Sequence, residues 1–110
     1  MEKKTKYGSR KTVMLGVAVD SAAEARRYQE LRVMEVAGEI TELQMQVKFS
    51  LDVNGVHICN FFPDFQYHSL RSDQTIVEDV KSKPTMTPVY RLKKKLLKAI
   101  HGIDIREVLA

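Results

Sequence analysis

The sequence predicts a single α/β domain of the α+β kind, in which a central mixed sheet is flanked by helices. Apolar residues recur at helical spacing from Ala22 to Ala37 and again from Val89 to His101, and they alternate with polar residues from Gln46 to Val53. The predicted order is helix, three-stranded meander, helix and strand. A chain of 110 residues is long enough to enclose one hydrophobic core.

Composition indicates a soluble globular protein with an anionic partner. Hydrophobic residues make up 44% of the chain and charged residues 29%, while a net charge of +4 and a pI near 9.3 favour polyanions. No apolar stretch approaches the roughly 20 residues of a membrane helix, and no secretory signal is visible. The single cysteine, Cys59, fits a reducing compartment, so we expect a cytoplasmic protein.

The first 12 residues are predicted to form a basic arm ahead of a domain that spans residues 13–110. The arm has little periodicity, and a disordered solubilising tail explains it as well as a nucleic-acid contact does. Its candidate DNA-binding cations are Lys6, Arg10 and Lys11. The apolar segment Val13–Val19 is interrupted by Gly16 and is either a strand or a packed lead-in.

The helix predicted over Ala22–Ala37 has clear start and stop signals. Ser21 precedes it and Glu24 follows three residues later, which matches a capping box, and Gly38 supplies the stop. Glu24 therefore has two interpretations: it caps the helix, or it is a carboxylate of a functional site at this helix end. Residues Glu39–Leu43 are expected to form a connector or a short helical turn.

The middle of the chain predicts three consecutive strands. The alternation over Gln46–Val53 ends at Asn54-Gly55, the strongest two-residue hairpin signal. The second strand, Val56–Tyr67, is expected to bend near Pro63, because proline cannot donate a hydrogen bond to a sheet. A polar turn leads to the third strand, Thr75–Lys81.

The second helix, Val89–His101, ends at Gly102 and precedes a short last strand over Ile103–Val108, which could instead be a frayed end. No acidic residue lies between Tyr90 and Gly102, so pairing within the helix cannot neutralise its cations. We expect these cations to face phosphate rather than to form an ordinary solvated surface. They are Arg91, Lys94, Lys95 and Lys98.

Two aspartates and a lysine are the main candidates for chemistry. On a strand, Asp79 and Lys81 share one face, whereas Glu78 faces the opposite side and is expected to be buried or paired there. Asp64 lies among core-forming aromatic residues, where a carboxylate needs a partner or a metal. Two carboxylates can hold a hard divalent cation beside the lysine. The simpler alternatives are a turn aspartate at Asp64 and a surface ion pair between Asp79 and Lys81.

Two further groups of residues carry weaker signals. Gln46 could reach the site through its amide, although an ordinary edge glutamine is the simpler interpretation. The three histidines lack the spacing of metal ligands and Cys59 stands alone, so a zinc site is not expected.

The ordered set resembles the PD-(D/E)XK nuclease superfamily. The residues that carry this resemblance are Glu24 on the first helix, Pro63-Asp64, Asp79-Val80-Lys81 and the basic helix. More narrowly, the chain resembles a small phage and prophage family of predicted nucleases that is often labelled Holliday-junction-resolvase-like. The segments similar to that family include Ser21–Tyr28, Gly38–Ile40, Gln46–Phe49, Val77–Lys81 and Tyr90–Leu96.

This resemblance implies a restriction-endonuclease-like αβββαβ core and a metal site. Asp64, Asp79, Glu24 and the carbonyl of Val80 would coordinate Mg²⁺ or Mn²⁺. Lys81 would orient or activate the attacking water and stabilise the charge of the transition state. Ser82 departs from the family pattern, which often has glycine there. Besides the cations named above, the candidate DNA contacts are Arg27 and Gln46.

The resulting expectation is a Mg²⁺-dependent endodeoxyribonuclease that cuts branched or Holliday-junction DNA during phage replication or recombination. A homodimer is expected because two symmetric cuts suit a two-fold axis. The location would be the host cytoplasm if the protein is phage-encoded. Two alternatives stay open: a non-catalytic nucleic-acid-binding module, and a structure-general nicking or restriction-like nuclease.

Overall fold

The computed structural model describes residues 12–14, 17–19 and 21–109. The basic arm predicted over residues 1–12 lies outside them except for position 12, and so do Lys6, Arg10 and Lys11. No helix in the described ranges is long and apolar enough to cross a membrane.

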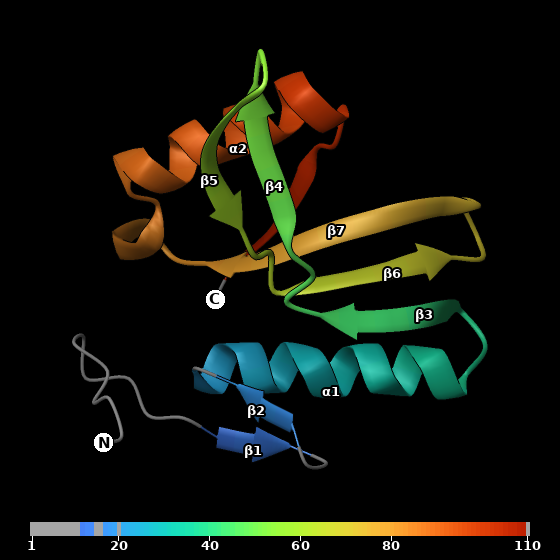
Figure 1. The fold of residues 1–110 in the computed structure, drawn as a ribbon. Helices are drawn as coiled ribbons and strands as arrows, with labels where there is room; N and C mark the ends of the chain where they lie inside the picture. The colour runs from blue at the N-terminus through green and yellow to red at the C-terminus, as the bar shows by residue number, and fades with distance from the viewer. Residues whose placement is uncertain (1–11, 15–16, 20, 110) are drawn as a thin grey trace.

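The fold is α+β, with two long helices and a mixed sheet, which confirms the predicted class at this level (Figure 1). A single-turn 3₁₀ helix covers Lys83–Thr85. The other elements are β1 (Thr12–Met14), β2 (Val17–Val19), α1 (Ala22–Val36), β3 (Ile40–Met45), β4 (Phe49–Val53), β5 (Val56–Phe61), β6 (Phe65–Ser69), β7 (Gln74–Lys81), α2 (Pro88–His101) and β8 (Ile105–Leu109).

The central sheet has four strands in the order β3-β6-β7-β8. Strands β3, β6 and β7 form an antiparallel meander, and β8 pairs with β7 in parallel after the crossover through α2. Helix α1 runs along β3, and the separate β4–β5 hairpin rises from the sheet beside α2 (Figure 1). The sheet thus lies between α1 on one face and α2 with the hairpin on the other.

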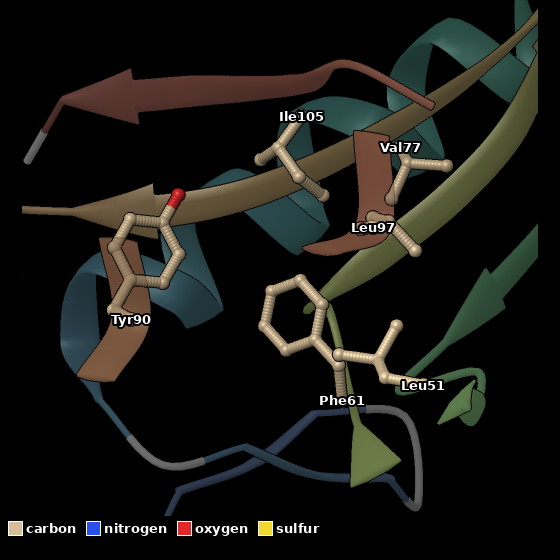
Figure 2. Packing of buried hydrophobic residues seen from close by; sticks show 6 residues of the cluster. All are labelled: Leu51, Phe61, Val77, Tyr90, Leu97 and Ile105. Carbon is tan, nitrogen blue, oxygen red and sulfur yellow. The ribbon is translucent and has the colours of Figure 1, made fainter. Parts of the chain in front are cut away.

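Each face of the sheet has its own hydrophobic core. Towards α1, the buried residues are Tyr28, Leu31, Ile40, Phe65 and Tyr67. Towards α2, side chains from the hairpin, the helix and the sheet pack together, as Figure 2 shows. These residues are Leu51, Phe61, Val77, Tyr90, Leu97 and Ile105. Strand β7 therefore presents alternate residues to two different apolar layers.

Helix boundaries agree with the local signals. Ser21 caps α1 by accepting the backbone N–H of Glu24 (3.0 Å), and Gly38 follows the helix with φ 80°. Thr87 caps α2, and Gly102 ends it in the left-handed conformation with φ 71°. The predictions for both helices and for the final strand are confirmed.

The meander was predicted with the wrong strands. Residues Glu39–Leu43, expected as a connector, lie mostly in β3, whose register shifts between Thr41 and Gln44. Glu42 there has φ 58°, so the strand contains an irregularity that breaks the period-two pattern on which a strand prediction relies.

The predicted second strand also divides in two. Val56–Tyr67 separates around buried Pro63 into β5, which pairs with β4, and β6, which joins the central sheet. The hairpin turn at Asn54-Gly55 is confirmed, with positive φ at both residues. The hairpin is therefore an insertion between β3 and β6 rather than the first part of the meander.

Candidate functional site

The candidate site lies at the end of β7, on the sheet face that is turned towards α2. Asp79 pairs in register with Glu107 of β8, two residues beyond the pair Val77 and Ile105. Because Val77 and Ile105 belong to the α2-side core, the strand period directs Asp79 and Glu107 to the same side. Two carboxylates from different strands thus border this core.

Asp64 joins the site through its backbone and its side chain. Its N–H donates to Asp79 Oδ1 at 2.8 Å, and its Oδ2 accepts the N–H of Val80 at 2.8 Å. Pro63 is buried immediately before it, which fixes the chain where β5 ends and β6 begins. The two aspartates predicted to act together are therefore brought together, across 15 positions of sequence.

The surroundings of Asp79 disfavour the state in which both Asp79 and Asp64 are ionised. Asp79 is 3% exposed, and this burial together with the charge of Asp64 raises its pKa to about 7. Lys81 acts in the opposite direction. The Oδ2 atom of Asp79 is buried and has no hydrogen-bond partner among the residues that the structure describes. A cation at this atom would relieve both the repulsion and the lost hydration.

Lys81 lies against an aromatic ring beside these carboxylates. Its Nζ is 4.0 Å from the ring centroid of Tyr90, a cation–π arrangement. The hydroxyl of Tyr90 donates to Glu107 Oε2 at 2.9 Å, and Lys94 Nζ donates to the same oxygen at 2.9 Å. Burial and the bond to Glu107 raise the pKa of Tyr90, so its hydroxyl stays protonated.

Sequence reasoning missed Tyr90 and Glu107 as members of the site. The sequence places Tyr90 in the second helix and in the family-like segment Tyr90–Leu96, and Glu107 in the last strand, but neither pattern assigns them to the site. The parallel register that sets Glu107 beside Asp79 carries no signature in the chain. The lysine Lys94 bonded to Glu107 holds the pKa of that carboxyl below its usual range.

Glu78 behaves as the strand alternation predicted. Its side chain is fully buried on the α1 side, where Arg27 binds it through two hydrogen bonds of 2.9 and 2.7 Å. The hydroxyl of Tyr67 donates to the same carboxylate, and Arg106 lies 3.8 Å away. Arg27, a candidate DNA contact, has only 17% of its side chain exposed and ties α1 to β7.

Two further candidates, Glu24 and Gln46, lie in α1 and just after β3. Glu24 is 5% exposed in the first turn of α1, next to the cap at Ser21. The N–H of Gln46 donates to the carbonyl of Asp64 at 3.1 Å, and Gln46 has φ 52°, a conformation that costs free energy for a residue other than glycine. Its side chain is exposed, so its backbone holds Asp64 while its amide faces solvent.

The four candidate DNA-binding cations of α2 are partly neutralised by carboxylates outside the helix. Lys94 pairs with Glu107, and Lys98 pairs with Asp104 at 2.8 Å. Arg91 and Lys95 are exposed on the same helix. The absence of acidic residues within α2 did not predict this, because both carboxylates come from the segment that follows the helix.

The oxygen ligands at the site are too few to surround a divalent cation, so water would have to complete its coordination shell. Within residues 21–109, no group of three His, Cys, Asp or Glu side chains is placed to hold a metal. Mg²⁺ is commonly bound by one or two carboxylates and completes its octahedron with water and phosphate oxygens. Asp64, Asp79 and the Val80 carbonyl could supply that share.

A comparison with protein families adds one assignment. The family model described as "Protein of unknown function (DUF1064)" matches residues 4–108. The chain belongs to the DUF1064 family. The DUF1064 match includes both helices, the central sheet and the residues of the candidate site. No curated protein and no solved structure matches the chain.

Proposed function

We propose that this protein is a metal-dependent DNA endonuclease of the PD-(D/E)XK type, acting on branched DNA such as a four-way junction. The observation that carries the proposal is the Asp64–Asp79 contact, with Lys81 two residues further along the same strand face. A buried carboxylate beside a half-buried one, next to an ammonium, could support the metal-assisted hydrolysis of a phosphodiester.

The topology supports this proposal independently of the side chains. Without the β1–β2 and β4–β5 pairs and the 3₁₀ helix, the elements read α1, β3, β6, β7, α2 and β8, and β8 is parallel to β7. This order agrees with the αβββαβ core that the sequence resemblance implies. The site then lies on the third core strand, where the resemblance would place it.

The chain's own residues would divide the work as follows. Asp64, Asp79 and the Val80 carbonyl would hold the cation, and water and phosphate oxygens would complete its shell. Glu24, expected as a further ligand, is not among them, because no third carboxylate of the described residues is placed to share the ion. The bound Mg²⁺ would supply Lewis acidity and lower the pKa of a coordinated water. The Lys81 ammonium would orient that water and stabilise the negative charge that develops on the phosphate oxygens.

The exposed cations Arg91 and Lys95 on α2 would contact the DNA backbone near the site. Such contacts read little sequence, so the shape and flexibility of the DNA would decide where it is cut. A junction requires two symmetric cuts, and two copies related by a two-fold axis would supply them.

The decisive experiment incubates purified protein with a synthetic four-way junction and a linear duplex of the same sequence, with Mg²⁺ or Mn²⁺. We expect junction cleavage by the wild type on denaturing gels and only background cleavage by Asp79→Asn, with binding retained in a mobility-shift assay. Lys81→Ala should lower the rate by about 100-fold. The matched control is Asp73→Asn, in an exposed turn where φ is 55° and asparagine is well tolerated.

The outcomes separate the alternatives. Equal cleavage of junction and duplex would replace the resolvase by a structure-general nuclease. Wild-type protein that binds DNA but never cuts it with any divalent ion would indicate a binding module. Unchanged cleavage by Asp79→Asn would remove the site from the mechanism.

A further inference from the structure

Tyr90 lies where the two sides of the candidate site meet. It belongs to the first turn of α2, it is 6% exposed, and its ring packs against Phe61 at 6.2 Å between centroids. Figure 2 shows this ring at the edge of the α2-side core, with its hydroxyl directed towards the sheet. The other face of the site comes from β7, whose Lys81 ammonium lies against the same ring.

Glu107 holds this ring in place. It accepts hydrogen bonds from the Tyr90 hydroxyl and from Lys94, so one carboxylate of β8 holds two side chains of α2. A phenol that donates to an anion has a more electron-rich ring, which strengthens its attraction for an ammonium. The aromatic face therefore offers Lys81 a fixed resting position without forming an ion pair that would neutralise it.

We propose that Tyr90, anchored by Glu107, is a positioning residue that holds the Lys81 ammonium at the Asp64–Asp79 pair. This inference rests on the proposed nuclease function and assigns a role to two residues outside the predicted metal and lysine set. A flexible lysine has about 2 kcal/mol of rotamer entropy, so restricting it beforehand raises the fraction of molecules ready to react.

The kinetic test compares Tyr90→Phe, which keeps the aromatic ring, with Tyr90→Met, which replaces the ring by a flexible apolar side chain. We expect Tyr90→Met to lower kcat by about tenfold with KM unchanged, and Tyr90→Phe to restore most of that loss. The same substitutions are then made in Lys81→Ala. Tyr90→Met should cost nothing further there, since the group that it positions is gone.

A second measurement needs no activity. Ring currents shift protons above an aromatic face to high field, so NMR of the Lys81 ε-methylene, assigned with Lys81→Arg, reports the contact directly. We expect high-field shifts in the wild type and in Tyr90→Phe, and ordinary shifts in Tyr90→Met. Ordinary shifts in the wild type would overturn the inference even if the protein cuts DNA.

Matched carboxylate variants separate positioning from general loss of structure. Glu107→Gln and Asp104→Asn each remove the partner of an α2 lysine, but only Glu107 also holds Tyr90. We expect a lower kcat for Glu107→Gln and an unchanged kcat for Asp104→Asn. Equal losses for Tyr90→Met in the wild-type and Lys81→Ala backgrounds would overturn the positioning role. A wild type that cuts no DNA would instead refute the proposed function, and the NMR shifts would still decide whether the ring holds Lys81.

Discussion

At the scale of single residues, the protein holds a buried aspartate, Asp79, next to a half-buried one, Asp64. The backbone makes this possible, because the N–H of Asp64 donates to the Asp79 carboxylate and the N–H of Val80 donates to the Asp64 carboxylate. These bonds stabilise ionised oxygens, while burial and mutual repulsion oppose ionisation. As a result, Asp79 stays protonated through much of the acidic pH range. A bound divalent cation would favour the ionised carboxylate instead.

This balance predicts a pH-dependent stability for the metal-free protein. Burial raises the pKa of Asp79 from 3.8 to about 7, so between these values the folded state binds more protons than the unfolded state. The free energy of unfolding therefore falls as pH rises from about 4 to about 7. With EDTA present, thermal melts should show the wild-type Tm falling by about 5 °C more than that of Asp79→Asn between pH 5 and pH 8.

Addition of Mg²⁺ at pH 8 should restore the wild-type Tm and leave Asp79→Asn unchanged, since only the ionised pair attracts the cation. Parallel curves of Tm against pH for wild type and Asp79→Asn would show that Asp79 does not have the raised pKa assigned to it.

At the scale of elements, β7 is held from both faces. Its α1 face is tied by the fully buried Glu78 to Arg27, and its α2 face borders the Tyr90 and Glu107 contact. Neighbouring residues of one strand thus lie in different environments: Glu78 pairs with Arg27 on the α1 side, and Asp79 lies at the candidate site on the α2 side. Alternation of side chains is the reason that both can occur at adjacent positions.

The Arg27–Glu78 pair yields a matched stability prediction. Arg27→Met leaves a buried carboxylate without its main cation and should lower the free energy of unfolding by about 3 kcal/mol. Arg32→Met, on the same helix, removes an exposed pair with Glu35 and should cost about 0–1 kcal/mol. Urea denaturation measures both. Similar losses for the two variants would mean that Glu78 is adequately stabilised by Tyr67 and Arg106.

At the scale of the whole molecule, the net charge is +4, but not every cation is free to attract a polyanion. Two lysines of α2 are paired with carboxylates that follow the helix, whereas Arg91 and Lys95 are exposed. The surface that could attract a polyanion is therefore narrower than the composition of α2 indicates, and it lies on the helix that also supplies Tyr90.

Binding to DNA should reflect this distribution. The double variant Arg91→Ala/Lys95→Ala should reduce the slope of log affinity against log salt by about 2, since each phosphate contact contributes about one unit. Lys98→Ala should change it less, because its ammonium is paired with Asp104. Titrations of a labelled junction at salt concentrations from roughly 50 to 200 mM, where counterion release strongly affects affinity, would measure both slopes. A larger effect of Lys98→Ala would contradict the assignment.

The sequence by itself determined the two helices with the Ser21 cap and the stops at Gly38 and Gly102, the Asn54-Gly55 turn and the inward direction of Glu78, because each depends on preferences within a few residues. It also identified Asp64, Asp79 and Lys81 as a candidate set. It did not reveal β3, since the irregularity at Glu42 breaks the alternation. Only the tertiary structure decided that Glu107 lies beside Asp79 and that Tyr90 lies under Lys81. These contacts depend on strand register and helix packing, which join residues that are distant in the chain and leave no local pattern.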